Sequence, residues 1–289
     1  MREGLRRAIL ITLVLPAVAL LAGRPAPAGQ VEPVVAAAGA AAAGDRQALA
    51  VADATLAAMG GQAAWDAAHF LRFTFDGRRT HYWDKWTGRH RLEGTTAAGE
   101  KYVVLENVIS RQGSAYVDGK PPAPERASQL VAGAYGAWIN DTYWLLMPYK
   151  LRDPGAHLAY AGRPRIDGRE YDEISVTFGP VGLTPGDRYW AWFDRDTHLL
   201  DRWAYRLEDE PRDATPTVWL WQGWHRYGQI MLAPHRLQPA SREKLELSAL
   251  LVAVAMPDAV FTSPAPVPDL NPDLGGPATA LGIGPPRRR

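Results

Sequence analysis

The sequence contains no cysteine, and this absence excludes several kinds of site at once. Without a thiol there is no disulfide, no thiolate metal ligand, no cysteine nucleophile and no lipid attached through an N-terminal cysteine. A chain without cysteine also cannot mispair in an oxidising compartment. The sequence is therefore compatible with export from the cytoplasm and offers no thiol chemistry.

A strong net charge is also missing. The 289 residues include 32 Lys and Arg against 31 Asp and Glu, which gives a formal net charge of +1. A chain this close to neutrality has no global field that would draw it to nucleic acid or to an anionic membrane. We therefore expect no nucleic-acid partner.

Sequence motifs for catalysis are missing as well. The chain has no G-x-S-x-G, H-E-x-x-H, G-x-G-x-x-G or P-loop pattern. The nearest metal-like cluster is Asp194-x-Asp196-x-His198, but it falls where a hairpin turn is needed, and Asp is a favoured turn residue. We expect no catalytic residue, no bound metal and no cofactor. A hydrolase built on these three residues is the minor alternative.

Long hydrophobic runs are absent after the first 22 residues. Three arginines among the first seven residues precede an apolar run at 8–22, and a small-x-small pattern follows at 26–28. This is the layout of a cleaved secretory signal peptide over residues 1–28. The run contains Pro16 and is shorter than the about 20 residues that a membrane span needs. We predict a periplasmic or secreted protein; the alternative is an inner-membrane anchor formed by an uncleaved N-terminus.

Composition divides the rest of the chain into three parts. Residues 29–44 are rich in Ala and Gly and are interpreted as a linker. Residues 264–289 are rich in Pro and Gly, and such a composition cannot bury enough apolar surface to fold, so we predict a disordered tail. Residues 45–263 between them are predicted to form one domain.

Helices are expected at two places in this domain. The first begins after Asp45, which can cap its N-terminus, and stops at Gly60-Gly61; a short second helix follows at 62–67. Residues 125–147 form a central segment of helical or mixed character. One apolar face of the first helix has helical spacing and consists of Leu49, Ala52, Leu56 and Met59.

Short strands separated by turn residues occupy most of the remaining sequence. They are predicted at 69–76, 80–92, 101–109, 114–118, 156–161, 170–178, 187–194, 199–207, 216–226 and 229–237. About ten strands in one meander are too many for a small flat sheet. The sequence therefore predicts a mainly β protein with helices (α+β): a single curved antiparallel sheet or half-open β-barrel, covered by the N-terminal helix and the central helical segment.

The aromatic residues are unusual in kind. There are 11 Trp and 11 Tyr but only 6 Phe. Side chains alternate between the two faces of a strand, so YWAWF at 189–193 and VWLW at 218–221 are apolar on both faces. Such strands must be covered on both sides. Ordinary core packing explains them, and so does a pocket for an apolar ligand, since Trp and Tyr pair an apolar body with a polar tip.

Several stretches resemble a known family. These are WINDTYWLLMPYKLRDPG at 138–155, YDEISVTF at 171–178, VGLTP at 181–185, and MGG at 59–61 with Trp65. They resemble a family of uncharacterised secreted bacterial proteins, which is similar in turn to the outer-membrane lipoprotein carriers of the LolA/LolB type. The resemblance covers roughly residues 47–240. It implies a half-open β-barrel with helices as a lid, an apolar cavity for acyl chains and no catalytic residues.

Two functions remain open on this basis. The first is a non-catalytic periplasmic binding or carrier protein for a hydrophobic ligand, such as a lipid, an acyl chain or a lipoprotein, with the membrane surface as a further candidate partner. The second is an envelope structural or protein-interaction module without a small ligand. For the first, the candidate lid residues are Trp138, Tyr143, Trp144 and Met147, and the candidate wall residues are Trp190, Trp192, Trp219 and Trp221.

Overall fold

The computed structural model describes residues 43–268 and 270. The predicted signal peptide at 1–28 lies outside the described residues. So does all of the predicted linker except Ala43–Gly44, and most of the tail predicted at 264–289.

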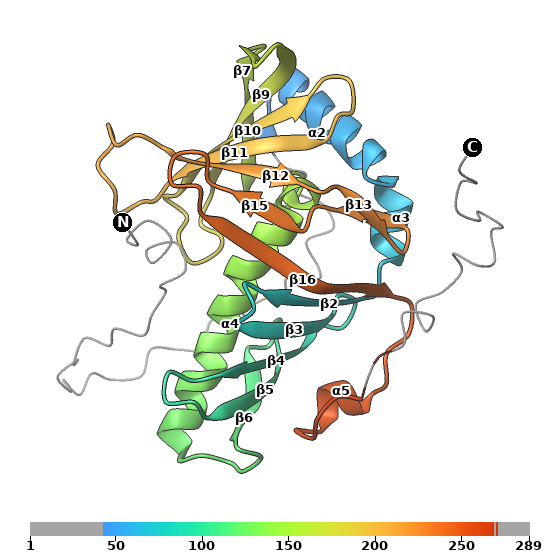
Figure 1. Ribbon diagram of the computed structural model, residues 1–289, viewed down its shortest axis with the longest axis vertical. Coiled ribbons are helices and arrows are strands. Elements are labelled where there is room, and N and C mark those ends of the chain that lie inside the picture. Colours follow the sequence, from blue (N-terminus) through green and yellow to red (C-terminus); the bar gives the residue numbers. More distant parts are fainter. Residues whose placement is uncertain (1–42, 269, 271–289) are drawn as a thin grey trace, which may run out of the picture.

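The described chain is built around one large open sheet, drawn in Figure 1. The strands are β1 (Ala43–Gly44), β2 (Phe70–Phe75), β3 (Arg79–Asp84), β4 (Arg89–Thr95), β5 (Lys101–Asn107), β6 (Gln112–Val117), β7 (Ala156–Gly162), β8 (Arg165–Ile166), β9 (Arg169–Phe178), β10 (Arg188–Asp194), β11 (Leu200–Arg206), β12 (Thr217–Gln222), β13 (His225–Tyr227), β14 (Ile230–Leu232), β15 (His235–Leu237) and β16 (Lys244–Ala253). Their order across the sheet is β1-β7-β9-β10-β11-β12-β15-β16-β2-β3-β4-β5-β6. Neighbours pair antiparallel, except that β1 is parallel to β7. β8 pairs only with β9, and β13 and β14 form a separate hairpin.

The predicted fold class is confirmed, but the predicted number of about ten strands is too low. Thirteen strands follow one another in the sheet within residues 43–268. The stretch predicted as one strand at 80–92 is two strands, because the chain turns through Thr87-Gly88 between β3 and β4. The predicted strands at 216–226 and 229–237 each divide in two as well, and the strand β16 was not predicted.

The N-terminal helices form as the sequence indicates. Helix α2 (Arg46–Ala58) is capped by Asp45, whose Oδ1 accepts a hydrogen bond from the backbone N of Ala48 at 2.7 Å. The helix stops at Gly60, whose φ is +121°, a backbone conformation that favours glycine. A Cβ at this position would lie 2.6 Å from the carbonyl oxygen of Gln229. Helix α3 (Gly61–Ala67) follows directly.

The predicted central helical segment is a long helix, α4 (Pro124–Leu146), followed by the 3₁₀ turn η2 (Met147–Lys150). The sheet curves around α4 (Figure 1). The first half of α4 packs on β5 and β6, where Ala134 meets Ala115 and Val104. Its last turns enter the main core beneath β9–β12. No helix in the part of the chain that the structure describes is long and apolar enough to cross a membrane.

The C-terminal segment crosses the outer face of the sheet beside β2–β4. A short helix, α5 (Ala259–Thr262), places Phe261 against Phe70 and Tyr82. The buried guanidinium of Arg91 donates a hydrogen bond to the carbonyl of Ala265 at 2.8 Å. The first described residues of the predicted tail therefore pack on the domain.

Candidate functional site

The inner face of the sheet and the end of α4 share a cluster of aromatic side chains. Pairing of β11 with β12 sets Trp203 opposite Trp219, so both project to the same face. Trp144 reaches this face from α4, with ring centroids 5.0 Å from Trp203 and 5.3 Å from Trp219. We call the following group the aromatic interior: Tyr143, Trp144, Tyr189, Trp203, Tyr205, Trp219 and Trp221.

The aromatic interior is buried and electrically neutral, but its hydrogen bonds are incomplete. Trp203, Trp219 and Trp221 are 1%, 0% and 3% exposed. Among the described residues the indole N–H groups of Trp203 and Trp221 have no acceptor, whereas the indole of Trp219 faces the hydroxyl of Tyr205 and hydrogen-bonds to it. A buried donor left without a partner costs about 1–3 kcal/mol. Burial raises the pKa of Tyr205 to about 12, so this phenol stays neutral. Side chains of α4 fill the space that these indoles face.

A buried arginine lies beside the aromatic interior. Arg236 on β15 pairs across the sheet with Trp221, and its guanidinium carbon lies 3.4 Å from the Trp221 ring centroid. Nη1 donates to the carbonyls of Ala233 and His235, and Nη2 donates to the carbonyl of Trp144 in α4. Nε has no acceptor among the residues that the structure describes. Burial lowers the pKa of Arg236, and in the described part of the chain no carboxylate offsets this effect.

A chain of buried polar groups attaches α4 to the other half of the sheet. Asp141 of α4 accepts two hydrogen bonds from Arg79, at 2.6 and 2.8 Å. His81 Nε2 lies 2.7 Å from Asp141 Oδ2, and His81 Nδ1 lies 3.0 Å from His90 Nε2. His90 Nδ1 lies 2.8 Å from Glu106 Oε1. We call these five residues the buried polar chain.

Burial and hydrogen bonding set the charges of His81 and Asp141. Burial, partly offset by the hydrogen bond to Asp141, lowers the pKa of His81 to about 4, so this imidazole is neutral at pH 7. Burial acts to raise the pKa of Asp141, but the hydrogen bonds from Arg79 and His81 outweigh it and leave the pKa lowered. Neutral His81 therefore donates to Asp141 and accepts from His90.

The charge of Asp141 is balanced by Arg79, and buried charges are tolerated when they are paired and hydrogen-bonded in this way. At the other end of the buried polar chain, Glu106 binds His90 through Oε1, and its Oε2 has no partner among the described residues.

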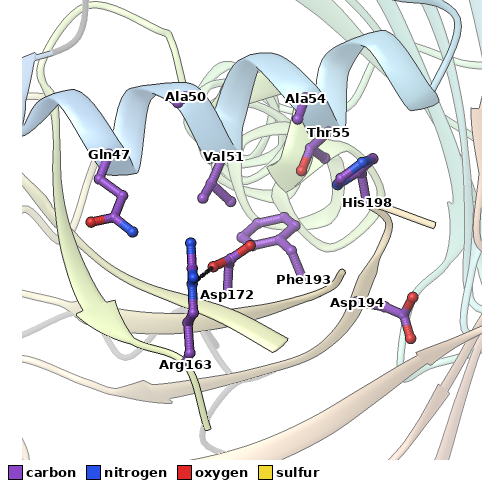
Figure 2. Close-up of a pocket in the computed structure, with 10 residues that line it drawn as sticks. All are labelled: Gln47, Ala50, Val51, Ala54, Thr55, Arg163, Asp172, Phe193, Asp194 and His198. Carbon is purple, nitrogen blue, oxygen red and sulfur yellow. Dashed lines mark hydrogen bonds and ion pairs between the residues drawn. The ribbon is translucent and has the colours of Figure 1, made fainter. Parts of the chain in front are cut away.

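Asp194, Asp196 and His198, the candidates for a metal site or a hydrolase, lie in a turn. Asp194 Oδ1 accepts hydrogen bonds from the backbone N of Asp196 at 3.1 Å and of Thr197 at 2.9 Å, which shapes the predicted turn between β10 and β11. Among the residues that the structure describes, no three His, Cys, Asp or Glu side chains are placed to hold a metal ion. Asp194 and His198 line a small pocket of about 190 Å³ between this turn and α2, shown in Figure 2.

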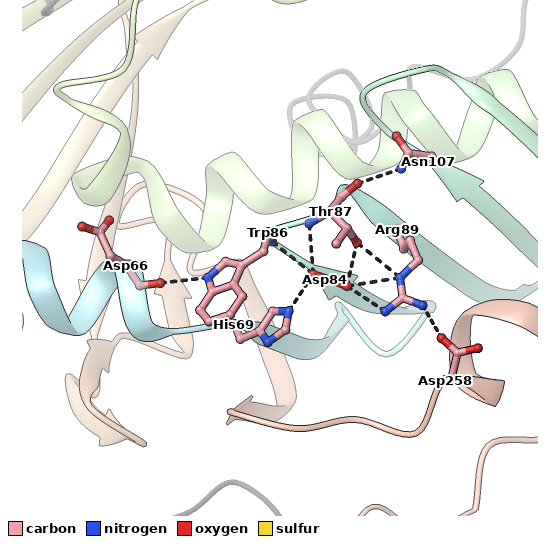
Figure 3. A network of polar contacts seen from close by, with 8 residues as sticks. All are labelled: Asp66, His69, Asp84, Trp86, Thr87, Arg89, Asn107 and Asp258. Atoms are coloured by element: carbon pink, nitrogen blue, oxygen red, sulfur yellow. Dashed lines mark hydrogen bonds and ion pairs between the residues drawn. The ribbon is translucent and has the colours of Figure 1, made fainter. Parts of the chain in front are cut away.

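A separate polar network holds the β3–β4 hairpin to the C-terminal segment (Figure 3). Asp84 is fully buried and accepts hydrogen bonds from Arg89, which also pairs with Asp258 ahead of α5. His69 lies 2.9 Å from Asp84, and the exposed Trp86 stacks on its ring. This network explains why the C-terminal segment stays on the outer face.

The structure brings together some of the residues predicted for a site and separates others. Four of the predicted residues meet in the aromatic interior: Tyr143, Trp144, Trp219 and Trp221. Met147 is buried in the same core. Trp138 packs instead against Trp83, with ring centroids 5.3 Å apart. Trp190 and Trp192 project from the outer face, because their neighbours on β10, Ala191 and Phe193, are in the core.

Sequence reasoning missed four residues of this region: Tyr189, Trp203, Tyr205 and Arg236. Trp203 had a usable signal, since it alternates with Tyr205 in a strand that was predicted at 199–207. Arg236 had none, because a lone arginine in a strand ordinarily faces water.

Fold and site together define a class of protein: a mainly β domain whose open sheet curves around one long helix, with an aromatic interior between them. The sequence matches no protein-family model and no curated protein.

Solved structures are similar at low identity. A DUF1329 family protein from Desulfovibrio piger has 15% identity and a TM-score of 0.41, covering 74% of this chain and 96% of its own. An outer membrane lipoprotein-sorting protein domain from Vibrio parahaemolyticus has 8% identity and a TM-score of 0.38, over 74% and 96%. A LolA superfamily protein from Nitrosomonas europaea has 11% identity and a TM-score of 0.31, over 71% and 98%. Two of these three neighbours carry names of the lipoprotein-sorting or LolA type, the type named in the sequence analysis.

Proposed function

We propose that this protein is an exported, non-catalytic binding or carrier protein for a hydrophobic ligand such as a lipid, an acyl chain or the acylated part of a lipoprotein. The observation that carries the proposal is the pair of buried indole N–H groups, those of Trp203 and Trp221, that have no acceptor among the described residues on one wall of the aromatic interior. Native proteins leave few buried polar groups unpaired, so two side by side call for an explanation. A ligand that presents carbonyl or hydroxyl oxygens supplies the missing acceptors.

The last turns of α4 act as the cover of the proposed site. In the present conformation Tyr143 and Trp144 occupy the space in front of Trp203 and Trp219. A ligand replaces these apolar contacts with apolar contacts of its own, so the hydrophobic contribution changes little on opening. The free energy needed to move α4 away then comes mainly from two polar contacts that must break. These are the ion pair of Asp141 with Arg79 and the hydrogen bond from Arg236 to the carbonyl of Trp144.

The proposed site is narrower than the set of residues that the sequence suggested. It comprises Tyr143, Trp144, Met147, Trp219 and Trp221, with Trp203 and Arg236 added. Trp138 is left out because it packs on Trp83, and Trp190 and Trp192 are left out because they face outward.

A neutral apolar probe tests the proposal. We expect diphenylhexatriene to bind saturably at one site and to accept energy from the indoles of the aromatic interior. Trp203→Phe replaces an indole of the wall by a smaller ring and so removes apolar contacts with the probe, which should weaken probe binding several-fold. Trp190→Phe, on the outer face, should leave it unchanged. Absence of saturable uptake, or equal effects of the two variants, would overturn the proposal.

An envelope interaction module without a small ligand is the second candidate. The observation in its favour is that α4 already fills the aromatic interior, with Trp144 in edge contact with Trp203, Tyr205 and Trp219. The same titration distinguishes the two candidates, because a permanently filled interior takes up no probe.

A further inference from the structure

We infer that Arg236 receives the anionic headgroup of the ligand, so that the ligand is an amphiphile with a carboxylate or a phosphate at the end of its apolar chain. This inference rests on the proposed function and specifies the ligand class. It follows from which edge of the guanidinium is free, from the missing counter-charge and from the position of the indoles.

One edge of the Arg236 guanidinium is fixed and the other is nearly free. Nη1 donates to two carbonyls of its own segment, Ala233 at 2.7 Å and His235 at 2.9 Å. The opposite edge consists of Nε, which has no acceptor, and Nη2, which donates to the carbonyl of Trp144. When the end of α4 moves away, Nε–H and Nη2–H become available together. Two parallel N–H groups of this kind match the two oxygens of a carboxylate or phosphate.

The same protein already uses this edge of an arginine in that way. Arg79 binds Asp141 through Nε at 2.6 Å and Nη2 at 2.8 Å. The carbonyl of Trp144 occupies the corresponding place on Arg236 with one oxygen instead of two. It stands in for the anion while the interior is closed.

The charge of Arg236 lacks a partner. The residue is 1% exposed, and in the described part of the chain no Asp or Glu is paired with it. The carboxylate of Asp141, about one turn before Trp144 on α4, is already bound by Arg79 and His81. A buried charge without a counter-ion is costly, so an anion that enters the interior stabilises it.

The positions of the aromatic side chains orient the rest of the ligand. The guanidinium lies over the ring of Trp221, and Trp203 follows, with ring centroids 5.4 Å apart. The free indole N–H groups of both residues lie along the same wall. A headgroup at Arg236 therefore presents its oxygens to the indole N–H groups of this wall, and the apolar chain continues beneath α4.

The test compares ligands that differ only in the charge of the headgroup. The full chain is titrated with palmitate, hexadecyl phosphate and neutral methyl palmitate, below their aggregation limits. We expect at least one of the two anions to bind about tenfold or more tightly than the ester, since hydrogen bonds to a charged group are stronger than neutral ones. Comparing palmitate with hexadecyl phosphate then distinguishes a carboxylate from a phosphate headgroup.

Variants locate the effect at Arg236. Arg236→Met should abolish the preference for the anion while methyl palmitate still binds, and Arg236→Lys should keep part of the preference. Arg202→Met is the matched control: Arg202 adjoins Trp203 on β11, faces outward and pairs with Asp201 at 2.8 Å. This control should keep the full preference.

The outcomes separate this inference from the proposed function. Equal affinity of the wild-type chain for the ester and both anions overturns the anionic headgroup and leaves the carrier function standing. Absence of binding by all three ligands overturns the carrier function itself. If Arg236→Met does not fold, the comparison of anions with the ester in the wild-type chain and in Arg236→Lys still tests the inference. A preference for the anion that is the same in Arg236→Lys and in Arg202→Met as in the wild type would show that the anion binds elsewhere.

Discussion

Asp141 carries more of the attachment of α4 than any other side chain named above. Its carboxylate is fully buried and binds both Arg79 and His81. Breaking a buried ion pair by removing one partner is strongly destabilising, because the other charge remains without compensation.

We predict that Asp141→Asn lowers the free energy of unfolding by about 3–5 kcal/mol, measured by urea denaturation at pH 7. Asp53→Asn is the control, since Asp53 and its partner Arg152 are both more than a third exposed and such pairs contribute about 0–1 kcal/mol. Equal destabilisation by the two variants would contradict the role assigned to Asp141.

The buried polar chain also makes stability depend on pH. The pKa of His81 is about 4 in the folded protein against 6.5 for an unperturbed imidazole. Between these two pH values the unfolded chain binds a proton at His81 that the folded chain does not bind. Stability must therefore fall as the pH decreases from 6.5 to 4, by about 3 kcal/mol from this residue. The lowered pKa of Asp141 adds a further loss at still lower pH.

His81→Gln tests this dependence, because glutamine keeps a donor toward Asp141 and does not titrate. We expect the variant to lose less stability than the wild type between pH 6.5 and 4, followed by urea denaturation at a series of pH values. A wild-type protein that becomes more stable toward pH 4 would show that the sign is wrong.

At the residue scale, sequence patterns identified the types of side chain in the site better than their directions. Alternation predicted that both faces of 189–193 are apolar, but it gave no means of deciding that Trp190 and Trp192 face outward. That direction depends on the register of β10 with β9 and β11. The burial of Arg236 could not be predicted from the sequence for the same reason, because it follows from the pairing of Arg236 with Trp221 across the sheet.

Among the elements, α4 combines strong attachments at its end with weak helix formers in its middle. Gly133 lies on the exposed side of the helix, and a Cβ there would meet no atom within 4 Å. Glycine in a helix interior is less favourable than alanine by about 0.5–1 kcal/mol.

Gly133→Ala should therefore raise the free energy of unfolding by about 0.5–1 kcal/mol. Gly113→Ala on β6 is the matched control, where the new Cβ would lie 2.5 Å from the carbonyl oxygen of Leu105 and should destabilise the protein. Thermal unfolding of both variants measures these changes. Destabilisation by Gly133→Ala would mean that α4 is not helical there.

Elements with local signals were predictable and β16 was not. Helix α2 was predictable because the signals at its two ends, the cap at Asp45 and the glycine at Gly60, are residues next to the helix in sequence. β16 is rich in Leu, Ala, Glu and Lys, which favour helices, and its regular alternation is broken by a register shift between Ser248 and Leu251. Its strand conformation depends on pairing with β15 and β2, and these partners are distant in sequence.

For the whole molecule, β16 joins two halves that contribute differently to the proposed site. The half containing β10–β12 and β15 supplies the indoles and Arg236, and the half containing β3–β5 holds α4 through the buried polar chain. The helix that covers the site is thus attached to both halves of one continuous sheet. Its displacement requires no change in the order of the strands.

Native mass spectrometry of the gently purified full chain, followed by organic extraction, tests the proposed carrier function most directly. We expect a stoichiometric adduct that extraction identifies as an amphiphile with an acyl chain, and loss of the adduct when denaturant unfolds the chain. A ligand-free protein that also takes up no apolar probe would contradict it, and would leave the aromatic interior as the filled core of an interaction module.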